Sequence, residues 1–247
     1  MTKTILITGG SRGIGRSAAI LAGQKGWSVG VNYASNKAAA DEVVEAVIAA
    51  GGKALAIQGD VAVEADVISM FEQTKQLGKL DGVVVNAGIV APASKLMDMD
   101  SDRMRRVFDV NVFGAYLCAR EAVRYLAPSR GGNGGSIVLL SSAAARIGGP
   151  FEYVDYAGSK GAMDSLTLGL AKEAGSENIR VNAVRPGLIE TDLHASGGQP
   201  DRAQRLGATA PLGRAGTAEE VGESIVWLLS DASSYVTGAL LDVTGGR

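Results

Sequence analysis

The sequence predicts an α/β fold built on a doubly wound, seven-stranded parallel sheet with helices on both faces. Short, β-rich apolar runs alternate with longer segments of helical periodicity along the whole chain. This alternation is typical of strands joined by crossover helices, which form parallel sheets. No shift in composition divides the 247 residues, so we predict a single domain, residues 1–247.

The predicted elements follow one another in that alternating order. The first apolar run predicts a buried strand at 4–8, and the segment after the next glycines predicts a helix at 13–23. A strand at 27–33 leads to a helix at 37–50, where Val43 and Val47 share one face. The remaining strands are predicted at 54–58, 82–85, 136–140, 180–184 and 238–243, and the remaining helices at 64–77, 100–126, 156–174 and 218–229.

One long segment, 188–217, lacks clear periodicity. It contains Gly197-Gly198, Pro200 and Pro211, which favour loops and turns. An irregular insert of this length in a compact domain is often a binding loop. We therefore expect 188–217 to form a substrate-binding loop or lid within the domain.

Composition and charge exclude several classes of protein. Hydrophobic residues make up 46% of the chain, charged residues 20%, and the formal net charge is −2, which gives no support to a nucleic-acid or membrane-surface partner. The single cysteine, Cys118, cannot form an intrachain disulfide, and the single histidine, His194, cannot supply a multi-histidine metal site, so no metal is expected. The apolar run at the N-terminus is too short for a signal peptide, and we expect a cytoplasmic protein.

Tyr156 and Lys160 stand four residues apart in a predicted helix, and therefore share one face. An ammonium beside a phenol favours the phenolate and makes the phenol a usable acid and base. Near the start of the chain, Gly9, Gly13 and Gly15 connect the first strand to the first helix, where a dinucleotide's phosphates can bind. Together these features predict proton transfer beside a nicotinamide, which is carbonyl/alcohol redox chemistry. Taken alone, the tyrosine–lysine pair could also be an ordinary helix face, and the turn a plain tight turn.

The second predicted strand indicates which nicotinamide cofactor is preferred. Sites selective for NAD usually place a carboxylate after this strand, but here the first acid is Asp41, inside the next helix. Arg12 projects from the glycine turn, and Ser35, Asn36 and Lys37 could hydrogen-bond a phosphate. We therefore predict NADP(H) as the preferred cofactor, with NAD(H) as the alternative if Arg12 and Lys37 are merely solvated.

Several motifs occur in one order along the chain: Thr8-Gly9-x-x-x-Gly13-x-Gly15, Asp60-Val61, Asn86-Ala87-Gly88, Asn111, Ser142, Tyr156-x-x-x-Lys160, and Pro186-Gly187 with Thr191. This ordered set closely resembles the short-chain dehydrogenase/reductase family over essentially the whole chain. The sequence is most similar to the branch of 3-oxoacyl-[acyl-carrier-protein] reductases and glucose dehydrogenases. The resemblance implies a single-domain Rossmann fold.

The resemblance also implies how a nicotinamide cofactor would be held. Asp60 and Val61 would lie beside the adenine, Asn86 to Gly88 along the cofactor, and Pro186 to Thr191 at the nicotinamide. The full set of expected cofactor-binding residues is Gly9, Ser11, Arg12, Gly13, Ile14, Gly15, Asn32, Ser35, Asp60, Val61, Asn86, Ala87, Gly88, Tyr156, Lys160, Pro186, Gly187, Ile189 and Thr191.

The resemblance implies four catalytic residues. Tyr156 would exchange a proton with the substrate oxygen, and Ser142 would hydrogen-bond that oxygen. Lys160 would bind the nicotinamide ribose and, together with an oxidised nicotinamide, lower the pKa of Tyr156. Asn111 would hold a water in a relay from Lys160 to solvent.

One spacing departs from the family's common pattern, since Ser142 precedes Tyr156 by one residue more than usual. An insertion between 148 and 155 explains this more simply than a lost serine. Adjacent side chains of a strand point to opposite faces, so only one of Ser141 and Ser142 can face the site, and we favour Ser142. Tyr153 is the tyrosine that could be mistaken for Tyr156, and we expect it in a pocket wall.

The predicted function is an NADP(H)-dependent oxidoreductase acting on a small carbonyl or secondary alcohol substrate. Two alternative substrate classes, 3-oxoacyl thioesters and sugars or polyols, would use the same catalytic residues. The non-enzyme alternative is a catalytically silent NADP sensor. A short basic cluster, Arg103, Arg105 and Arg106, suits an acyl-carrier partner or a solvated helix face equally well. The resemblance implies a homotetramer joined through helices at 100–126 and 156–174.

Overall fold

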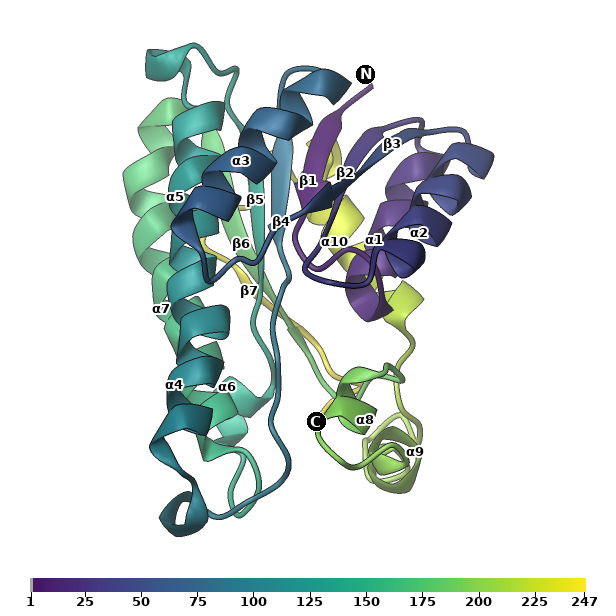
Figure 1. Cartoon of the computed structure of the whole chain (residues 1–247), viewed down its shortest axis with the longest axis vertical. Helices are drawn as coiled ribbons and strands as arrows, with labels where there is room; N and C mark the ends of the chain where they lie inside the picture. Colours follow the sequence, from purple (N-terminus) through teal and green to yellow (C-terminus); the bar gives the residue numbers. More distant parts are fainter. Residues whose placement is uncertain (1) are drawn as a thin grey trace.

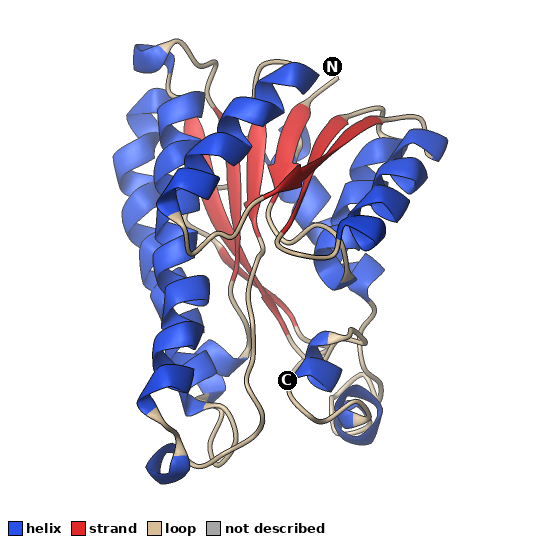
Figure 2. Cartoon of the chain, in the orientation of Figure 1, coloured by secondary structure: helices blue, strands red, loops and turns tan. Residues whose placement is uncertain are grey.

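Seven parallel strands form one sheet in the order β3-β2-β1-β4-β5-β6-β7 (Figures 1 and 2). The structure is a computed structural model and describes residues 2–247. The predicted α/β fold with a seven-stranded parallel sheet is confirmed. The strands are β1 (Thr4–Ile7), β2 (Ser28–Tyr33), β3 (Lys53–Gln58), β4 (Gly82–Val85), β5 (Gly135–Leu140), β6 (Ile179–Pro186) and β7 (Leu240–Val243).

Helices cover both faces of the sheet (Figure 2). One face carries α1 (Gly13–Gln24), α2 (Lys37–Ala49) and α10 (Ala218–Leu229), and the other carries α3 (Glu64–Thr74), α5 (Ala115–Leu126) and α7 (Val154–Ala174). Side chains alternate along each strand, so Ile5 and Ile7 pack in the α1 layer while Leu6 packs in the α3 layer. Burial on both faces explains why the strands are continuous apolar runs.

The segments outside this regular pattern are short. The predicted helix at 100–126 is α4 (Ser101–Phe108), a π-helical turn η3 (Asp109–Gly114) and α5 in succession. Three helices that the sequence did not predict are α6 (Ala144–Ile147), α8 (Leu193–Ser196) and α9 (Arg202–Gly207); each has six residues or fewer, too few for a periodic pattern. Single 3₁₀ turns lie at Lys75–Leu77, Leu96–Asp98, Pro128–Arg130, Gly175–Glu177 and Asp231–Ser233. Within residues 2–247, none of the helices has the length and apolar character needed to span a bilayer.

The chain reverses its direction of winding between β1 and β4. It runs outward from β1 to β3 and then returns to place β4 beside β1. Thr8 joins the carboxyl ends of these two strands, because its buried Oγ1 accepts hydrogen bonds from Asn86 N (2.9 Å) and Ala87 N (3.0 Å). In open α/β sheets, ligands bind outside the carboxyl ends of the strands at such a reversal.

Candidate active site

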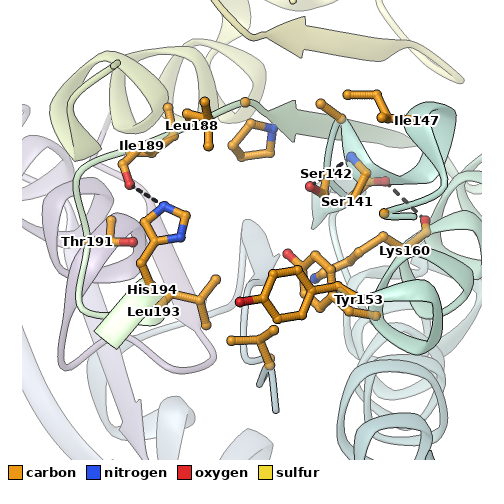
Figure 3. A pocket seen from close by; sticks show the side chains of 18 of the residues that line it. Ser141, Ser142, Ile147, Tyr153, Lys160, Leu188, Ile189, Thr191, Leu193 and His194 are labelled. Carbon is orange, nitrogen blue, oxygen red and sulfur yellow. Dashed lines mark hydrogen bonds between the residues drawn. The ribbon is translucent and has the colours of Figure 1, made fainter. Parts of the chain in front are cut away.

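A cavity of about 340 Å³ opens at the carboxyl ends of β4, β5 and β6 (Figure 3). Its walls come from the glycine turn, the end of β4, the start of α7 and the segment after β6 that carries α8 and α9. Nine predicted cofactor residues line it: Ile14, Asn86, Gly88, Tyr156, Lys160, Pro186, Gly187, Ile189 and Thr191. The other predicted residues of that set, and Asn111, do not line it.

Tyr156 and Lys160 lie one helical turn apart on α7, with Lys160 Nζ 5.6 Å from the centre of the Tyr156 ring. The Lys160 side chain is buried and donates a hydrogen bond to the Leu140 carbonyl oxygen (2.7 Å) at the end of β5. This contact fixes the amine beside the phenol. Both groups line the same cavity.

Burial controls the pKa values of this pair. It raises the pKa of Tyr156 to about 12, although a hydrogen bond with Ser142 acts in the opposite direction. It lowers the pKa of Lys160 to about 8, although the negative charge of Asp164 acts in the opposite direction. Without cofactor the phenol pKa is therefore raised, whereas the expected lowering includes the charge of a bound, oxidised nicotinamide. The largest cause is the removal of the phenolate from water, which disfavours its charge.

The two serines at the end of β5 have different surroundings. Ser142 is half-buried, lines the cavity, and accepts a hydrogen bond from Ala144 N (3.1 Å) at the start of α6. Ser141 is buried, and its Oγ lies 3.0 Å from the Lys160 carbonyl oxygen and 2.7 Å from Asp164 Oδ1. Ser141 thus holds α7 against the sheet. The Ser142 hydroxyl can still donate a hydrogen bond into the cavity.

Asn111 is buried in the π-helical turn η3, and its amide reaches two segments of the chain. Its Oδ1 accepts from Ile89 N (2.8 Å), while its Nδ2 donates to Ile89 O (2.9 Å) and to Ser159 Oγ (3.1 Å). Gly88 separates Asn111 from Lys160, because a Cβ built there would lie 3.3 Å from Asn111 Oδ1 and 3.4 Å from Lys160 Nζ. The asparagine therefore fixes the loop after β4 next to the lysine.

The glycine turn depends on left-handed backbone and close approach. Gly9 (φ 61°) and Gly13 (φ 53°) adopt conformations that favour glycine, and a Cβ on Gly15 would lie 2.5 Å from the Gly9 carbonyl oxygen. Asn86 Nδ2 donates to Gly9 O (3.0 Å), and Asn32 Oδ1 accepts from Gly9 N (3.0 Å). Asn32 is buried and lies beneath the turn, where it fixes the turn's position.

The residues expected near a 2′-phosphate or an adenine differ in exposure. Arg12 precedes α1 and is exposed, and the first turn of α1 contains no acidic residue. Ser35 is exposed, but Lys37 pairs with Asp41 (2.6 Å). Asp60 accepts from Ala62 N (2.9 Å) and lies 3.3 Å from Arg106, while Val61 is buried.

Sequence reasoning missed three ion pairs around the cavity. Arg103 of α4 pairs with Asp155 (2.9 Å), the residue before Tyr156, and Arg185 of β6 pairs with Asp164 (2.7 Å). Asp164 could have been found, because it lies four residues after Lys160 on the same helix. The third pair joins Arg202 of α9 to Glu152 (2.7 Å), fifty residues apart, and no sequence pattern indicates it.

Tyr153 and His194 approach the cavity from opposite sides (Figure 3). Tyr153 is buried at the start of α7, and its hydroxyl accepts a hydrogen bond from Gln199 Nε2 (2.9 Å). His194 of α8 has its Nε2 3.0 Å from the Ile189 carbonyl oxygen, and burial lowers its pKa against the effect of that contact. Both side chains therefore belong to the cavity wall.

A family model, related proteins and a solved structure all indicate the same family for this chain. A family model described as enoyl-(acyl carrier protein) reductase matches residues 9–247. The chain is 50% identical over 243 residues to the uncharacterized oxidoreductase YgfF of Escherichia coli, covering 98% of each chain. It is 40% identical to an L-rhamnose 1-dehydrogenase (NAD(P)(+)) of a Sphingomonas species, covering 99% of this chain and 95% of the relative.

Two further relatives extend the comparison. The chain is 37% identical to the 3-oxoacyl-[acyl-carrier-protein] reductase FabG of Staphylococcus aureus, covering 100% of this chain and 98% of the relative. The crystal structure of a short-chain type dehydrogenase/reductase from Mycobacterium marinum superposes with a TM-score of 0.92 at 36% identity, covering 99% of this chain and 94% of that one. The chain is therefore an oxidoreductase that belongs to the short-chain dehydrogenase/reductase family.

Proposed function

We propose that this protein is an NADP(H)-dependent oxidoreductase that interconverts a carbonyl compound and a secondary alcohol, with Tyr156 as the proton donor and acceptor. The observation that carries the proposal is the convergence of Tyr156, Lys160 and Ser142 on one cavity at the point where the sheet reverses its winding. A proton-transfer group, a cation and a hydrogen-bond donor are the groups that carbonyl reduction needs from a protein.

The residues around the cavity fit a dinucleotide. The left-handed backbone at Gly9 and Gly13 opens the start of α1, whose free N–H groups and dipole favour phosphates. Asn86, Gly88 and Thr191 would line the nicotinamide half, since they share the cavity with Tyr156. When bound, the cofactor supplies or accepts the hydride at the substrate carbon.

The protein's own residues would handle the proton and the charge on oxygen. In reduction, Tyr156 Oη gives its proton to the carbonyl oxygen, and in oxidation it takes the hydroxyl proton. Ser142 Oγ would donate to the same oxygen and stabilise the charge that develops there. Lys160 would bind the ribose and favour the phenolate. Asn111, beside Gly88, would hold a water that passes a proton from solvent in reduction and to solvent in oxidation.

The preference for NADP(H) rests on charge. Arg12 is exposed at the start of α1 and makes no ion pair within residues 2–247. No carboxylate follows β2 before Asp41, whose charge is taken up by Lys37. A 2′-phosphate would therefore meet a cation and the Ser35 hydroxyl rather than a repelling anion.

A sugar or polyol dehydrogenase is the second candidate. Glu152 and Tyr153 line the cavity, and Gln199 hydrogen-bonds to both. These polar groups suit a substrate with several hydroxyls, and one relative is named an L-rhamnose 1-dehydrogenase. A 3-oxoacyl carrier substrate has less support, because Arg103 and Arg106 of the basic cluster are engaged by Asp155 and Asp60.

A paired screen of NADPH oxidation and NADP reduction tests the proposal. The panel comprises acetoacetyl thioesters, simple ketones, quinones, sugars and the corresponding alcohols. We expect turnover with at least one carbonyl–alcohol pair, faster with NADP(H) than with NAD(H). Tight NADPH binding without turnover across the panel would instead support the non-enzyme alternative, an NADP sensor.

The proposed assembly follows from the same resemblance. A homotetramer would cover Phe113 and Tyr116 of the η3–α5 segment, which are 53% and 43% exposed in the single chain. Cys118 is buried in the same segment, and burial raises its thiol pKa to about 12, which suits an unreactive core residue. Light scattering tests the assembly, and a stable monomer would contradict it.

A further inference from the structure

The cavity contains a charged pair with no part in the proton transfer. Arg202 of α9 and Glu152 of the α6–α7 loop both line the cavity, and their side chains are 13% and 33% exposed. Arg202 NH1 donates to Glu152 Oε1 at 2.7 Å. The guanidinium also lies over the Tyr153 ring, 5.0 Å from its centre. The pair therefore belongs to the wall that faces the substrate.

The surrounding polar groups hold Glu152 in this position. Gln199 Nε2 donates to Glu152 Oε1 (3.1 Å) as well as to the Tyr153 hydroxyl (2.9 Å). The backbone of Glu152 is also fixed, because its carbonyl oxygen accepts a hydrogen bond from Ser94 N (3.0 Å) in the loop after β4. Glu152 thus connects three loops that surround the cavity.

The local backbone is bent to present this carboxylate. Gly148 (φ 83°), Gly149 (φ 55°) and the non-glycine Phe151 (φ 67°) all adopt left-handed conformations. A left-handed phenylalanine costs free energy and persists only where surrounding contacts impose it. Phe151 is itself exposed, and the turn around it is closed by a backbone hydrogen bond from Tyr153 N to Gly149 O (2.9 Å), while Glu152 and Tyr153 make the side-chain contacts.

The charges of Glu152 and Arg202 decide whether this part of the cavity wall can bind a substrate anion. Hydrogen bonding from Arg202 lowers the pKa of Glu152, so the carboxylate stays ionised at neutral pH. A guanidinium in a substrate cavity would attract a carboxylate or phosphate, but here an internal carboxylate already occupies it. A substrate anion would have to compete with Glu152 and be repelled by it.

We propose that Glu152 and Arg202 are a specificity-determining pair that restricts the cavity to neutral carbonyl compounds and alcohols, with Glu152 acting as an internal substitute for a substrate anion. This inference rests on the proposed function for the identity of the ligand, a carbonyl compound. It concerns the part of the substrate beyond the reacting carbon, which contacts neither Tyr156 nor Ser142.

The test compares one anionic and one neutral carbonyl compound, acetoacetate and its methyl ester. Each is titrated by ligand-observed NMR into the protein loaded with NADP, so the readout does not depend on turnover. The wild-type protein should bind the ester more tightly. Glu152→Gln keeps the shape but frees the guanidinium, and should shift the affinity ratio toward acetoacetate by about tenfold, the size of one charge-assisted contact.

A second variant should shift the ratio in the opposite direction. Arg202→Gln leaves the Glu152 carboxylate without its cation, so acetoacetate should be rejected more strongly than by the wild type. The double variant E152Q/R202Q should lose the gain of E152Q, which distinguishes Arg202 from Arg247, a second arginine that lines the cavity. Asp201→Asn is the matched control, because Asp201 is exposed and pairs with Arg205 outside the cavity wall (3.6 Å).

Three results would overturn the inference: an unchanged ratio in a folded E152Q protein, a shift in the same direction in E152Q and R202Q, or a gain that survives in the double variant. If circular dichroism shows that E152Q is unfolded, the sign of the shift in R202Q decides. If the carbonyl panel gives no turnover but the ratios shift as expected, the proposed function fails and the specificity pair stands.

Discussion

Replacing Thr8 by valine tests how the fold holds the glycine turn beside β4. Valine has nearly the same shape but cannot accept the hydrogen bonds from Asn86 N and Ala87 N, at 2.9 and 3.0 Å. Thr8 is fully buried, so no water can replace its hydroxyl without rearrangement. Each buried donor left without an acceptor costs about 1–3 kcal/mol. Because both donors belong to half-buried residues, we expect a total loss of about 2–3 kcal/mol in the free energy of unfolding.

Thermal and urea unfolding at one fixed protein concentration measure this loss. For a chain of this length, the loss corresponds to a decrease of about 4–12 °C in Tm. Thr8→Ser is the matched control, since it keeps the hydroxyl and loses one methyl group, at a cost of about 1 kcal/mol. A T8V protein as stable as the wild type, or more stable than T8S, would refute the reasoning.

Three further predictions concern the charges of the site. Burial lowers the pKa of Lys160 to about 8 from 10.5, so between these values Lys160 holds its proton in the unfolded chain but not in the folded one, and its own contribution to stability should rise with pH across that window. Lys160→Met should therefore be more stable than the wild type below pH 8, with the advantage shrinking by about 3 kcal/mol up to pH 10.5; a pH-independent difference in urea unfolding would contradict this. Arg12→Gln should raise the KM for NADPH about tenfold and leave that for NADH unchanged, whereas the exposed Arg16→Gln should change neither; equal changes for both cofactors would exclude a 2′-phosphate contact. The ultraviolet difference between wild type and Y156F should report a phenol pKa near 12 without cofactor and a lower one with NADP bound, and a value below 10 in the free protein would be inconsistent with burial as the cause.

The sequence predicts the sheet because strands buried on both faces are continuous apolar runs, which can be recognised in the sequence. The strand at 82–85 and the helix at 218–229 have the predicted bounds, and most others differ by one or two residues. Helices α8 and α9 could not be predicted, because they are too short for a periodic pattern and because their segment is held by contacts between distant residues, such as Arg202 with Glu152 and Gln199 with Tyr153. Local propensity carries no information on such contacts.

The candidate site also has features that sequence patterns predict and features that depend on contacts between distant segments. Helical spacing is enough to bring Tyr156 and Lys160 together, and the alternation of side chains along a strand is enough to give Ser141 and Ser142 different partners. The pKa of Tyr156 could not be predicted, because it depends on how far the surrounding loops remove the phenol from water. The role of Asn32 beneath the turn also depends on depth, which the sequence does not express.

The central claim is that Tyr156 exchanges the proton while the rest of the site binds the cofactor. Single-turnover kinetics of Tyr156→Phe, with NADPH affinity measured in parallel by fluorescence, test it most directly, and Tyr153→Phe is the matched control from the same cavity wall. We predict a loss of about a hundredfold or more in the chemical step of Y156F, with NADPH affinity within about threefold of the wild type. Chemistry in Y156F at a rate close to that of the wild type would contradict the account.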